Sequence, residues 1–408
     1  MKRRDFMKST AVATALTASG AFGATALTAE AARSDKPMVR RYSPLGKTGV
    51  KMGDIAFGAG RLPSASLILR AIDRGVNYID TAPDYGPSED LIGDALTRFR
   101  QRDKVYIASK FCHPIPYQSG RSHLQVGSSR KEYIESVESS LKRLGTDYLD
   151  VVFVHAIGEK ASFGDEKARL VDDEMLEAVE VLKKQGKIRA LAVSSHGPHN
   201  MEKLMLEAVR SGHFDAIMPA FNFMQFPKLP EVLDEAYRRG VGVVAMKTLA
   251  GDKKAGAKSG GPEFAQAAFK WVLKHPGVSG LVITMKSVSD LDRYIPASGQ
   301  GFTPGDQKVL DRYAALHGMD YCRTGCGDCE AGCDEGVPVA TILRQQMYFE
   351  DYGDEKRAMQ GYAHLTKSAA ACLACSGDPC NDGCAYGLKV GGKLRAAHRT
   401  LSFDLQVG

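Results

Sequence analysis

The segment Tyr148-Leu149-Asp150-Val151-Val152-Phe153-Val154 is a short run of mostly apolar residues, rich in valine. Such a run is typical of a strand buried on both faces of a sheet. It follows a segment of helical period, Lys131 to Leu144, with apolar residues at Ile134, Val137, Leu141 and Leu144. A helix leading into a buried strand is the repeating unit of a parallel α/β fold.

The same alternation extends along most of the chain. Seven more runs predict strands, at Asp54–Gly58, Asn77–Asp80, Val105–Ser109, Ile188–Val193, Ala216–Pro219, Gly242–Met246 and Gly280–Thr284. Further helices are predicted at Asp173–Lys184, Met201–Ser211, Leu229–Arg239 and Phe264–His275. Eight strands is the number that a closed parallel (β/α)8 TIM barrel requires.

A doubly wound parallel sheet would share this alternation, but it needs a Gly-rich phosphate loop after its first strand. The segment that follows here, Gly58-Ala59-Gly60-Arg61-Leu62-Pro63, lacks the G-x-G-x-x-G spacing. The barrel is therefore favoured, and we place it at residues 38–318.

Composition sets wide limits on function. The 408 residues are 44% hydrophobic and 25% charged, which suits one large domain with an appendage. The net charge of +6 comes from 54 basic and 48 acidic side chains without a long basic stripe. Binding to nucleic acid is therefore not expected.

The N-terminus has features of an export signal. The segment Met1-Lys2-Arg3-Arg4-Asp5-Phe6-Met7-Lys8 precedes a mildly apolar run, Thr10 to Ala26, and the triplet Ala29-Glu30-Ala31. It resembles a twin-arginine signal peptide over residues 1–32, with a disordered basic tail as the alternative. The resemblance implies recognition by the twin-arginine translocation machinery, which exports folded proteins, and a periplasmic location.

Four polar residues lie at or just after three successive predicted strands: Asp80, Tyr85, Lys110 and His155. In a parallel barrel the C-terminal strand ends share one rim, so these side chains should converge. Hydride transfer to a carbonyl needs a proton donor beside the oxygen, which a tyrosine can supply. Lys110 would lower the pKa of Tyr85, Asp80 would hold Lys110, and neutral His155 would orient the carbonyl. Each residue alone also suits a structural role, such as capping or packing.

Three stretches of the chain around these four residues resemble the signatures of a known enzyme family. They are Tyr78-Ile79-Asp80-Thr81-Ala82-Pro83-Asp84-Tyr85-Gly86, Val105-Tyr106-Ile107-Ala108-Ser109-Lys110 and Asp147-Tyr148-Leu149-Asp150-Val151-Val152-Phe153-Val154-His155. They resemble signatures of the aldo-keto reductases, over roughly Arg40 to Leu316. The resemblance implies a TIM barrel, a small carbonyl or alcohol substrate, NADP(H) bound without a Gly-rich loop, and the four residues above as the catalytic set.

The resemblance also implies a nicotinamide site. Ser194 matches the serine that holds the carboxamide, and Ser195 stands where the family has asparagine. Met218 and Met246 occupy the positions of a glutamine and of an aromatic that stacks on the ring. Lys247 would contact the pyrophosphate, although a solvated lysine is an equal alternative.

A second part of the implied cofactor site is Met285-Lys286-Ser287-Val288-Ser289, which resembles the segment around the 2'-phosphate of NADP. Lys286 and Ser287 supply a cation and a hydroxyl for that phosphate, and Arg293 would be a second cation. NADP is therefore preferred over NAD.

The last quarter of the chain is rich in cysteine, and we predict a separate Cys-rich domain at residues 319–408. Two runs, C-x3-C-x2-C-x3-C and C-x2-C-x4-C-x3-C, contain Cys322, Cys326, Cys329, Cys333, Cys372, Cys375, Cys380 and Cys384. This spacing indicates two [4Fe-4S] clusters, with structural zinc and disulfides as alternatives. The remaining Cys112, in a long loop after the third strand, is expected to pack beside the pocket.

The two runs resemble those of bacterial two-cluster ferredoxins, in which the last cysteine of each run binds the other cluster. By that analogy one cluster is held by Cys322, Cys326, Cys329 and Cys384, and the other by Cys372, Cys375, Cys380 and Cys333. The clusters would relay electrons to or from the barrel and a partner protein. The rival hypothesis is a binding or redox-sensing barrel without turnover, whose C-terminal domain is stapled by zinc or disulfides.

Overall fold

The structure is a computed structural model that describes residues 36–115, 122–159, 162–197, 199–224, 228–250, 261–323 and 326–402. The segment predicted as a signal peptide lies outside these residues. From Lys36 onward the chain forms one compact unit. Among the described helices, none combines the length and the apolar character needed to cross a bilayer.

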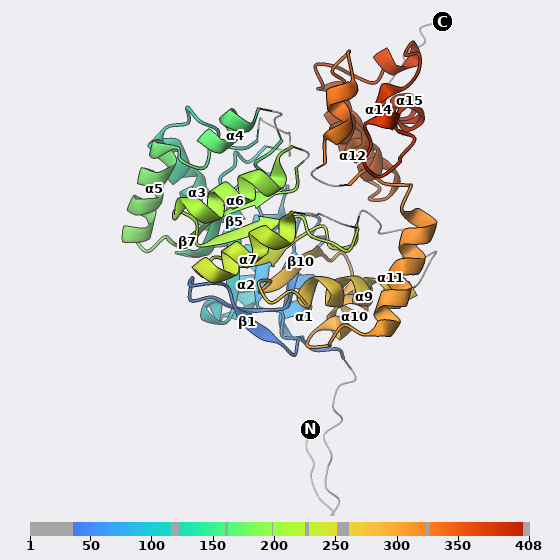
Figure 1. Ribbon diagram of the computed structural model, residues 1–408. Helices are drawn as coiled ribbons and strands as arrows, with labels where there is room; N and C mark the ends of the chain where they lie inside the picture. The colour runs from blue at the N-terminus through green and yellow to red at the C-terminus, as the bar shows by residue number, and fades with distance from the viewer. Residues whose placement is uncertain are drawn as a thin grey trace, which may run out of the picture. The chain divides into compact units, whose positions relative to one another are not determined.

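Eight parallel strands close into a barrel, visible at the centre of Figure 1. Its closure is the pairing of the last strand with the first, where Leu281 lies opposite Ile55. The strands are β3 (Ile55–Gly58), β4 (Tyr78–Asp80), β5 (Tyr106–Lys110), β6 (Leu149–Val154), β7 (Ile188–Ser195), β8 (Ala216–Pro219), β9 (Gly242–Ala245) and β10 (Gly280–Thr284). The predicted (β/α)8 barrel is therefore confirmed.

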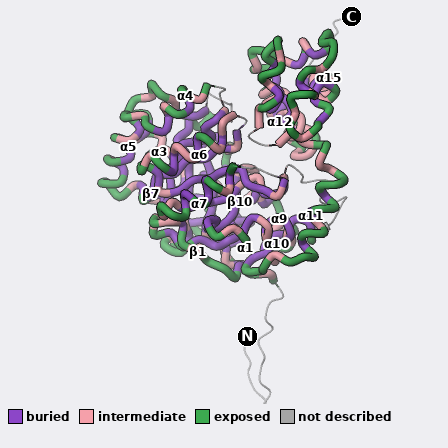
Figure 2. The backbone as a smooth tube through the Cα atoms, viewed as in Figure 1, coloured by how far each residue is buried: buried purple, intermediate pink, exposed green. Residues whose placement is uncertain are grey.

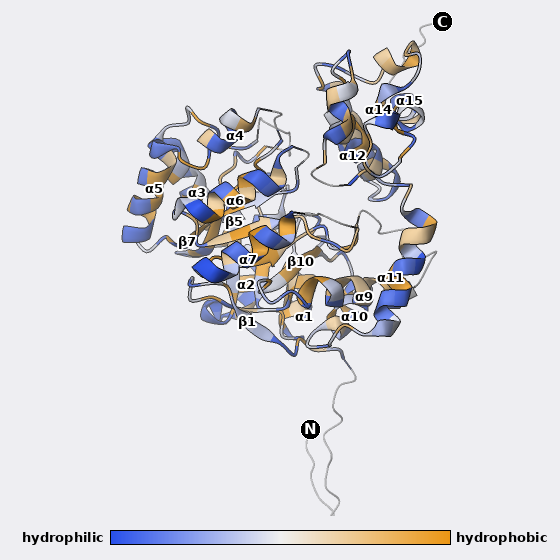
Figure 3. Cartoon of the chain, in the orientation of Figure 1, coloured by the Kyte–Doolittle hydropathy of each residue, from blue (hydrophilic) through white to orange (hydrophobic). Residues whose placement is uncertain are grey.

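Helices surround the barrel, and their apolar faces pack on it (Figure 3). They are α1 (Ala65–Ile72), α2 (Ser88–Phe99), α3 (Arg130–Leu144), α4 (Phe163–Ala168), α5 (Asp173–Lys184), α6 (Met201–Ser211), α7 (Leu229–Arg239), α9 (Gly261–Leu273), α10 (Val288–Tyr294) and α11 (Pro304–His317). Helix α3 begins at a capping box between Ser129 and Glu132 and ends at the left-handed Gly145.

An N-terminal hairpin of β1 (Tyr42–Pro44) and β2 (Lys51–Gly53) contributes to the core inside the barrel. Its residues Leu45, Val50 and Met52 are buried with the inward-facing side chains of the strands. Those inward side chains include many alanines and few large residues: Ala56, Tyr78, Ala108, Val151, Phe153, Ala190, Ala192, Ala216, Met218, Val244 and Val282. In Figure 2 the strands of the barrel are mostly purple, which marks buried residues. The hairpin therefore fills space that the small barrel residues leave.

The C-terminal part is helical, with α12 (Val339–Glu350), α13 (Glu355–Ala363), α14 (Pro379–Asp382) and α15 (Val390–Leu401). Two short 3-10 helices, η3 (Asp328–Gly332) and η4 (Ala371–Leu373), carry cysteines. Buried residues from Cys329 to Leu401 form a hydrophobic cluster of their own. Among the described residues, no strand follows Thr284. The likeness to ferredoxins therefore concerns the cysteine spacing and not a sheet.

Asp150 provides a test of how the barrel is held together. Its buried carboxylate accepts hydrogen bonds from Arg102 at 3.0 Å, Arg189 at 2.7 Å and the Ile107 backbone N–H at 2.9 Å. Asp150→Ala leaves the Ile107 backbone N–H without this acceptor and removes the carboxylate partner of Arg102 and Arg189, and we expect a loss of about 3 kcal/mol in urea unfolding followed by circular dichroism. The exposed Asp94, paired with Arg98 in α2, is the control, and Asp94→Ala should cost about 0.5 kcal/mol or less. Equal losses for the two variants would contradict this assignment.

Candidate active site

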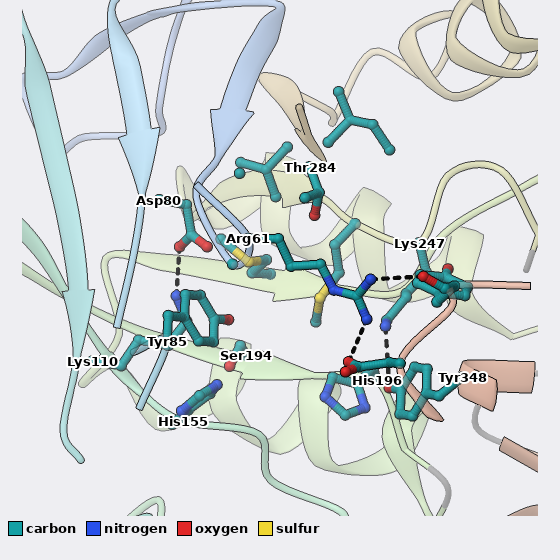
Figure 4. Close-up of a pocket in the computed structure, with 18 of the residues that line it drawn as sticks. Arg61, Asp80, Tyr85, Lys110, His155, Ser194, His196, Lys247, Thr284 and Tyr348 are labelled. Carbon is teal, nitrogen blue, oxygen red and sulfur yellow. Dashed lines mark hydrogen bonds and ion pairs between the residues drawn. The ribbon is translucent and has the colours of Figure 1, made fainter. Parts of the chain in front are cut away.

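The four predicted catalytic residues lie together at the C-terminal rim of the barrel, as Figure 4 shows. Asp80 and Lys110 end β4 and β5, His155 directly follows β6, and Tyr85 lies in the turn after β4. All four line one cavity. The convergence expected from their places in the sequence is therefore present in the structure.

The Lys110 ammonium is buried and compensated by two short contacts. Its Nζ donates to Asp80 Oδ1 and to the Thr81 carbonyl, both at 2.7 Å. It also lies 5.1 Å from the ring centroid of Tyr85. A carboxylate and a carbonyl thus stabilise the charge of Lys110 and fix its position beside the tyrosine.

The electrostatics keep Tyr85 and His155 uncharged. Burial, followed by the carboxylates Asp80 and Asp84, raises the pKa of Tyr85 well above its usual range. This differs from the expectation that Lys110 would lower that pKa, because burial and two carboxylates dominate. Burial, then His123 and Lys110, lowers the pKa of His155 well below 6.5. Tyr85 is therefore a protonated donor and His155 a neutral imidazole.

The cavity also contains five of the eight residues expected to bind the cofactor: Ser194, Met218, Met246, Lys247 and Lys286. Ser194 Oγ accepts a hydrogen bond from the Ala156 backbone N–H at 2.9 Å. The other three, Ser195, Ser287 and Arg293, are not among its lining residues. Ser195 Oγ donates to the Ile157 carbonyl at 2.7 Å, and Ser287 Oγ caps α10.

Residues beyond the barrel complete the cavity. Tyr348, Tyr352, Asp354 and Arg357, on and between α12 and α13, line it together with the barrel residues. Arg61, in the loop after β3, forms an ion pair with Asp354 and donates to the Tyr352 carbonyl at 2.6 Å. The C-terminal part therefore forms one wall of the cavity.

Two further contacts join the same parts of the chain. Lys247 Nζ donates to the Tyr348 hydroxyl at 3.2 Å, and Arg344 Nη1 lies 2.6 Å from His196 Nδ1. Burial raises the pKa of Tyr348, but Lys247, Arg344 and Arg357 outweigh it and bring the pKa to about 7. The side of the cavity lined by Lys247 and Arg357 is therefore cationic, and the ionisable phenol of Tyr348 lies on this side.

The C-terminal cysteines form two groups, and each group mixes the two runs. Burial raises the pKa of Cys329 to about 12, and the like charges that add to this effect are those of Cys322, Cys384 and Cys326. Burial raises the pKa of Cys372 to about 11, and the added like charges are those of Cys333, Cys380 and Cys375. Helix η3 contacts α14, which brings the runs together. All nine cysteines of the chain are free thiols.

Comparisons with known proteins agree with this barrel. Residues 62–258 match the model of the aldo/keto reductase family. L-galactose dehydrogenase of Arabidopsis thaliana is 26% identical over 309 residues, covering 67% of this chain and 92% of that protein. L-glyceraldehyde 3-phosphate reductase of Escherichia coli is 25% identical over 337 residues, covering 67% and 92%.

A solved structure from Pseudomonas aeruginosa, assigned to the aldo-keto reductases, superposes with a TM-score of 0.53. It is 28% identical, and the match covers 65% of this chain and 97% of that one. The fold and the rim residues define a parallel barrel with a polar cavity at its C-terminal rim. The family model, the relatives and the solved structure show that this chain is similar to aldo/keto reductases, and they support an oxidoreductase.

The low pKa of Tyr348 can be tested by spectroscopy. With a pKa of about 7, Tyr348 should form tyrosinate above neutral pH, where ordinary tyrosines with a pKa of about 10 remain protonated. Titration by ultraviolet absorbance should show this step, and Tyr348→Phe should remove it. Lys247→Met should shift it to higher pH, whereas the control Tyr352→Phe should leave it unchanged. An unaltered titration in Tyr348→Phe would refute the assignment.

Proposed function

We propose that this protein transfers hydride between NADP(H) and a small carbonyl or alcohol substrate at the barrel rim. The observation that carries the proposal is that Tyr85 lines one cavity together with the buried Lys110, Asp80 and His155. When bound, the nicotinamide supplies the hydride for reduction or accepts it for oxidation.

The chain's own residues supply the proton and the orientation. In reduction, the carbonyl carbon gains the hydride and its oxygen gains one proton, which the Tyr85 hydroxyl donates. The Lys110 ammonium, held by Asp80, stabilises the resulting phenolate. Neutral His155 donates a hydrogen bond to the substrate oxygen and so fixes which face meets the nicotinamide. Oxidation of an alcohol reverses each transfer.

The residues present suit a dinucleotide with negative charge. From the catalytic end the cavity extends past Ser194 and Met218 to Lys247 and Lys286, so cations are available for phosphates. Lys286 and Ser287 are exposed where a 2'-phosphate would be bound, which favours NADP over NAD. Ser195 faces Ile157 instead, so Ser194 would act on the carboxamide without it.

The sharpest test of this proposal is the removal of one hydroxyl. Tyr85→Phe should lower kcat for reduction of glyceraldehyde with NADPH by about 10²- to 10⁴-fold, because the proton donor is lost. Binding of NADPH, measured by fluorescence, should persist. The control is Tyr237→Phe, which changes a tyrosine that is 64% exposed. Undiminished turnover in Tyr85→Phe, or no turnover with any carbonyl in the unaltered protein, would favour the non-turnover alternative.

The proposal extends to two [4Fe-4S] clusters in the C-terminal part that relay electrons between the barrel and a partner. Its support is the mixed grouping of the thiols, which matches the shared ligation of two-cluster ferredoxins. A zinc tetrathiolate would bring its sulfurs to about 3.8 Å from one another. None of the eight C-terminal cysteines, all of them described, belongs to a group of three or more such ligand atoms within 4.8 Å of one another, so the thiols as placed do not form a closed zinc tetrahedron.

Iron analysis after anaerobic purification can test both the clusters and their ligands. The unaltered protein should hold about eight iron atoms per chain, and Cys384→Ser about four. Adding Cys326→Ser to Cys384→Ser should lose no further cluster, because both residues bind the same one. Adding Cys326→Ser to Cys333→Ser should lose both clusters. If instead Cys326→Ser with Cys384→Ser lost both clusters and Cys326→Ser with Cys333→Ser lost only one, each run would bind its own cluster. Colourless protein with zinc alone would exclude the relay.

We also propose that the twin-arginine signal exports this protein, already folded, to the periplasm. The support is the Arg3-Arg4 pair followed by Phe6, the apolar run and the Ala29-Glu30-Ala31 triplet. Folded export suits a protein whose cofactors are inserted before transport. Because NADPH is a cytoplasmic compound, electron exchange through the clusters would then replace exchange of the nucleotide.

A further inference from the structure

Four potential metal ligands lie together beside the catalytic cavity, in the loops that follow the three successive strands β4, β5 and β6. They are Asp84, Cys112, His123 and His155, and each is at most 4% exposed. One ligand atom from each residue lies within 4.8 Å of the other three. Cys112 and His123 are held next to each other by an antiparallel bridge within the loop after β5.

The distances between these ligand atoms suit a tetrahedral metal site. Cys112 Sγ lies 2.9 Å from His155 Nδ1, and Asp84 Oδ2 lies 3.6 Å from the same nitrogen. Asp84 Oδ2 is 3.5 Å from His123 Nε2. The edges of a tetrahedron with metal–ligand bonds of about 2.0–2.3 Å measure about 3.3–3.7 Å. The distances of 3.5 and 3.6 Å match these edges, whereas the sulfur–nitrogen distance of 2.9 Å would have to lengthen on binding.

Asp84 is a buried carboxylate whose present countercharge is an imidazolium. Its side chain is fully buried, and the two nearest ring nitrogens, of His123 and His155, lie at 3.5 and 3.6 Å. Burial lowers the pKa of His123, but Glu159 and Asp84 outweigh it and bring the pKa to about 9. Because a buried carboxylate is costly without a positive charge, a metal ion that displaced the His123 proton would take over this compensation.

A second carboxylate orients one of the imidazoles. Glu159 Oε2 lies 3.1 Å from His123 Nδ1, on the opposite side of the ring from Asp84. Carboxylate–histidine–metal arrangements of this kind fix the ring orientation in zinc proteins and increase the basicity of the ligand nitrogen. On the other loop, Arg169 donates to the His155 carbonyl at 2.8 Å and holds that backbone.

We propose that Asp84, Cys112, His123 and His155 bind one divalent cation of the zinc class. Two imidazole nitrogens, one thiolate and one carboxylate are a ligand set for Zn²⁺, whereas Mg²⁺ and Ca²⁺ prefer oxygen alone. Binding releases the Cys112 thiol proton and the His123 Nε2 proton, and it uses the lone pair of His155 Nδ1, so His155 Nε2 retains its proton. This site is separate from the C-terminal cysteines.

The consequence of this site for catalysis rests on the proposed function. Metal binding itself does not depend on that function. His155 also lines the catalytic cavity. A cation on Nδ1 makes the Nε2–H group a stronger hydrogen-bond donor and prevents ring rotation. His155 would then orient the substrate oxygen as a metal-bound imidazole, and Asp84, Cys112 and His123 would be positioning residues.

Metal content tests the binding site without reference to turnover. Full-length protein carrying its C-terminal metal centres is dialysed against Zn²⁺, and zinc and iron per chain are measured. The unaltered protein should hold one more tightly bound zinc than Cys112→Ser or His123→Gln, at equal iron. His113→Ala changes an exposed histidine on the same loop and should retain that zinc.

Two further measurements keep the proposal falsifiable if a variant folds poorly. Asp84→Asn retains the shape of the side chain, and its affinity for Zn²⁺ should fall by about 10-fold or more. With Co²⁺, the unaltered protein and His113→Ala should show a thiolate-to-cobalt absorption band that Cys112→Ser lacks. Equal zinc in the unaltered protein, Cys112→Ser and Asp84→Asn would overturn the proposal and leave a hydrogen-bonded cluster only.

Discussion

The closed hydrogen bonding of the barrel, completed where β10 pairs with β3, is the constraint on which the rest of the structure depends. Because all eight strands are parallel, every strand delivers its C-terminal residue to the same rim. Asp80 and Lys110 end neighbouring strands, and their side chains therefore meet at 2.7 Å without help from a long loop. An open sheet would leave its first and last strands far apart, and Lys286, after β10, would not share a cavity with Tyr85.

Much of the barrel could be predicted because its elements follow simple periodicities. The predicted bounds of β8, β10, α5, α6 and α7 agree with the structure residue for residue. These segments are buried on one stripe or on both faces, so their pattern is set by the core alone. The hairpin of β1 and β2 escaped prediction because Tyr42–Pro44 and Lys51–Gly53 are short, partly exposed and contain polar residues, proline and glycine, so they form no apolar run. Its role depends on the space left inside the barrel.

The residues of the candidate site also include some that the sequence predicts and some that it does not. The clustering of the four predicted catalytic residues could be foreseen because each lies at or just after a strand end, a position that the sequence defines. Tyr348 and Arg357 could not be found, because nothing local marks a helical residue that packs over a distant cavity. The Lys247–Tyr348 contact spans 101 residues, and the Arg61–Tyr352 contact spans 291. Such contacts depend on how the C-terminal part docks, which no periodicity encodes.

In this cavity burial disfavours the charged form of each ionisable group, whereas a neighbouring charge of opposite sign favours it. Which effect prevails differs from one group to the next. Lys110 has a carboxylate and a carbonyl as close partners. Burial lowers the pKa of Lys247, and its hydrogen-bonding partner is a phenol whose own pKa falls to about 7. Tyr85 has carboxylates as its charged neighbours, and its pKa rises. Two buried tyrosines in one cavity are thus driven in opposite directions, so that Tyr85 keeps its proton near neutral pH while Tyr348 can release its own.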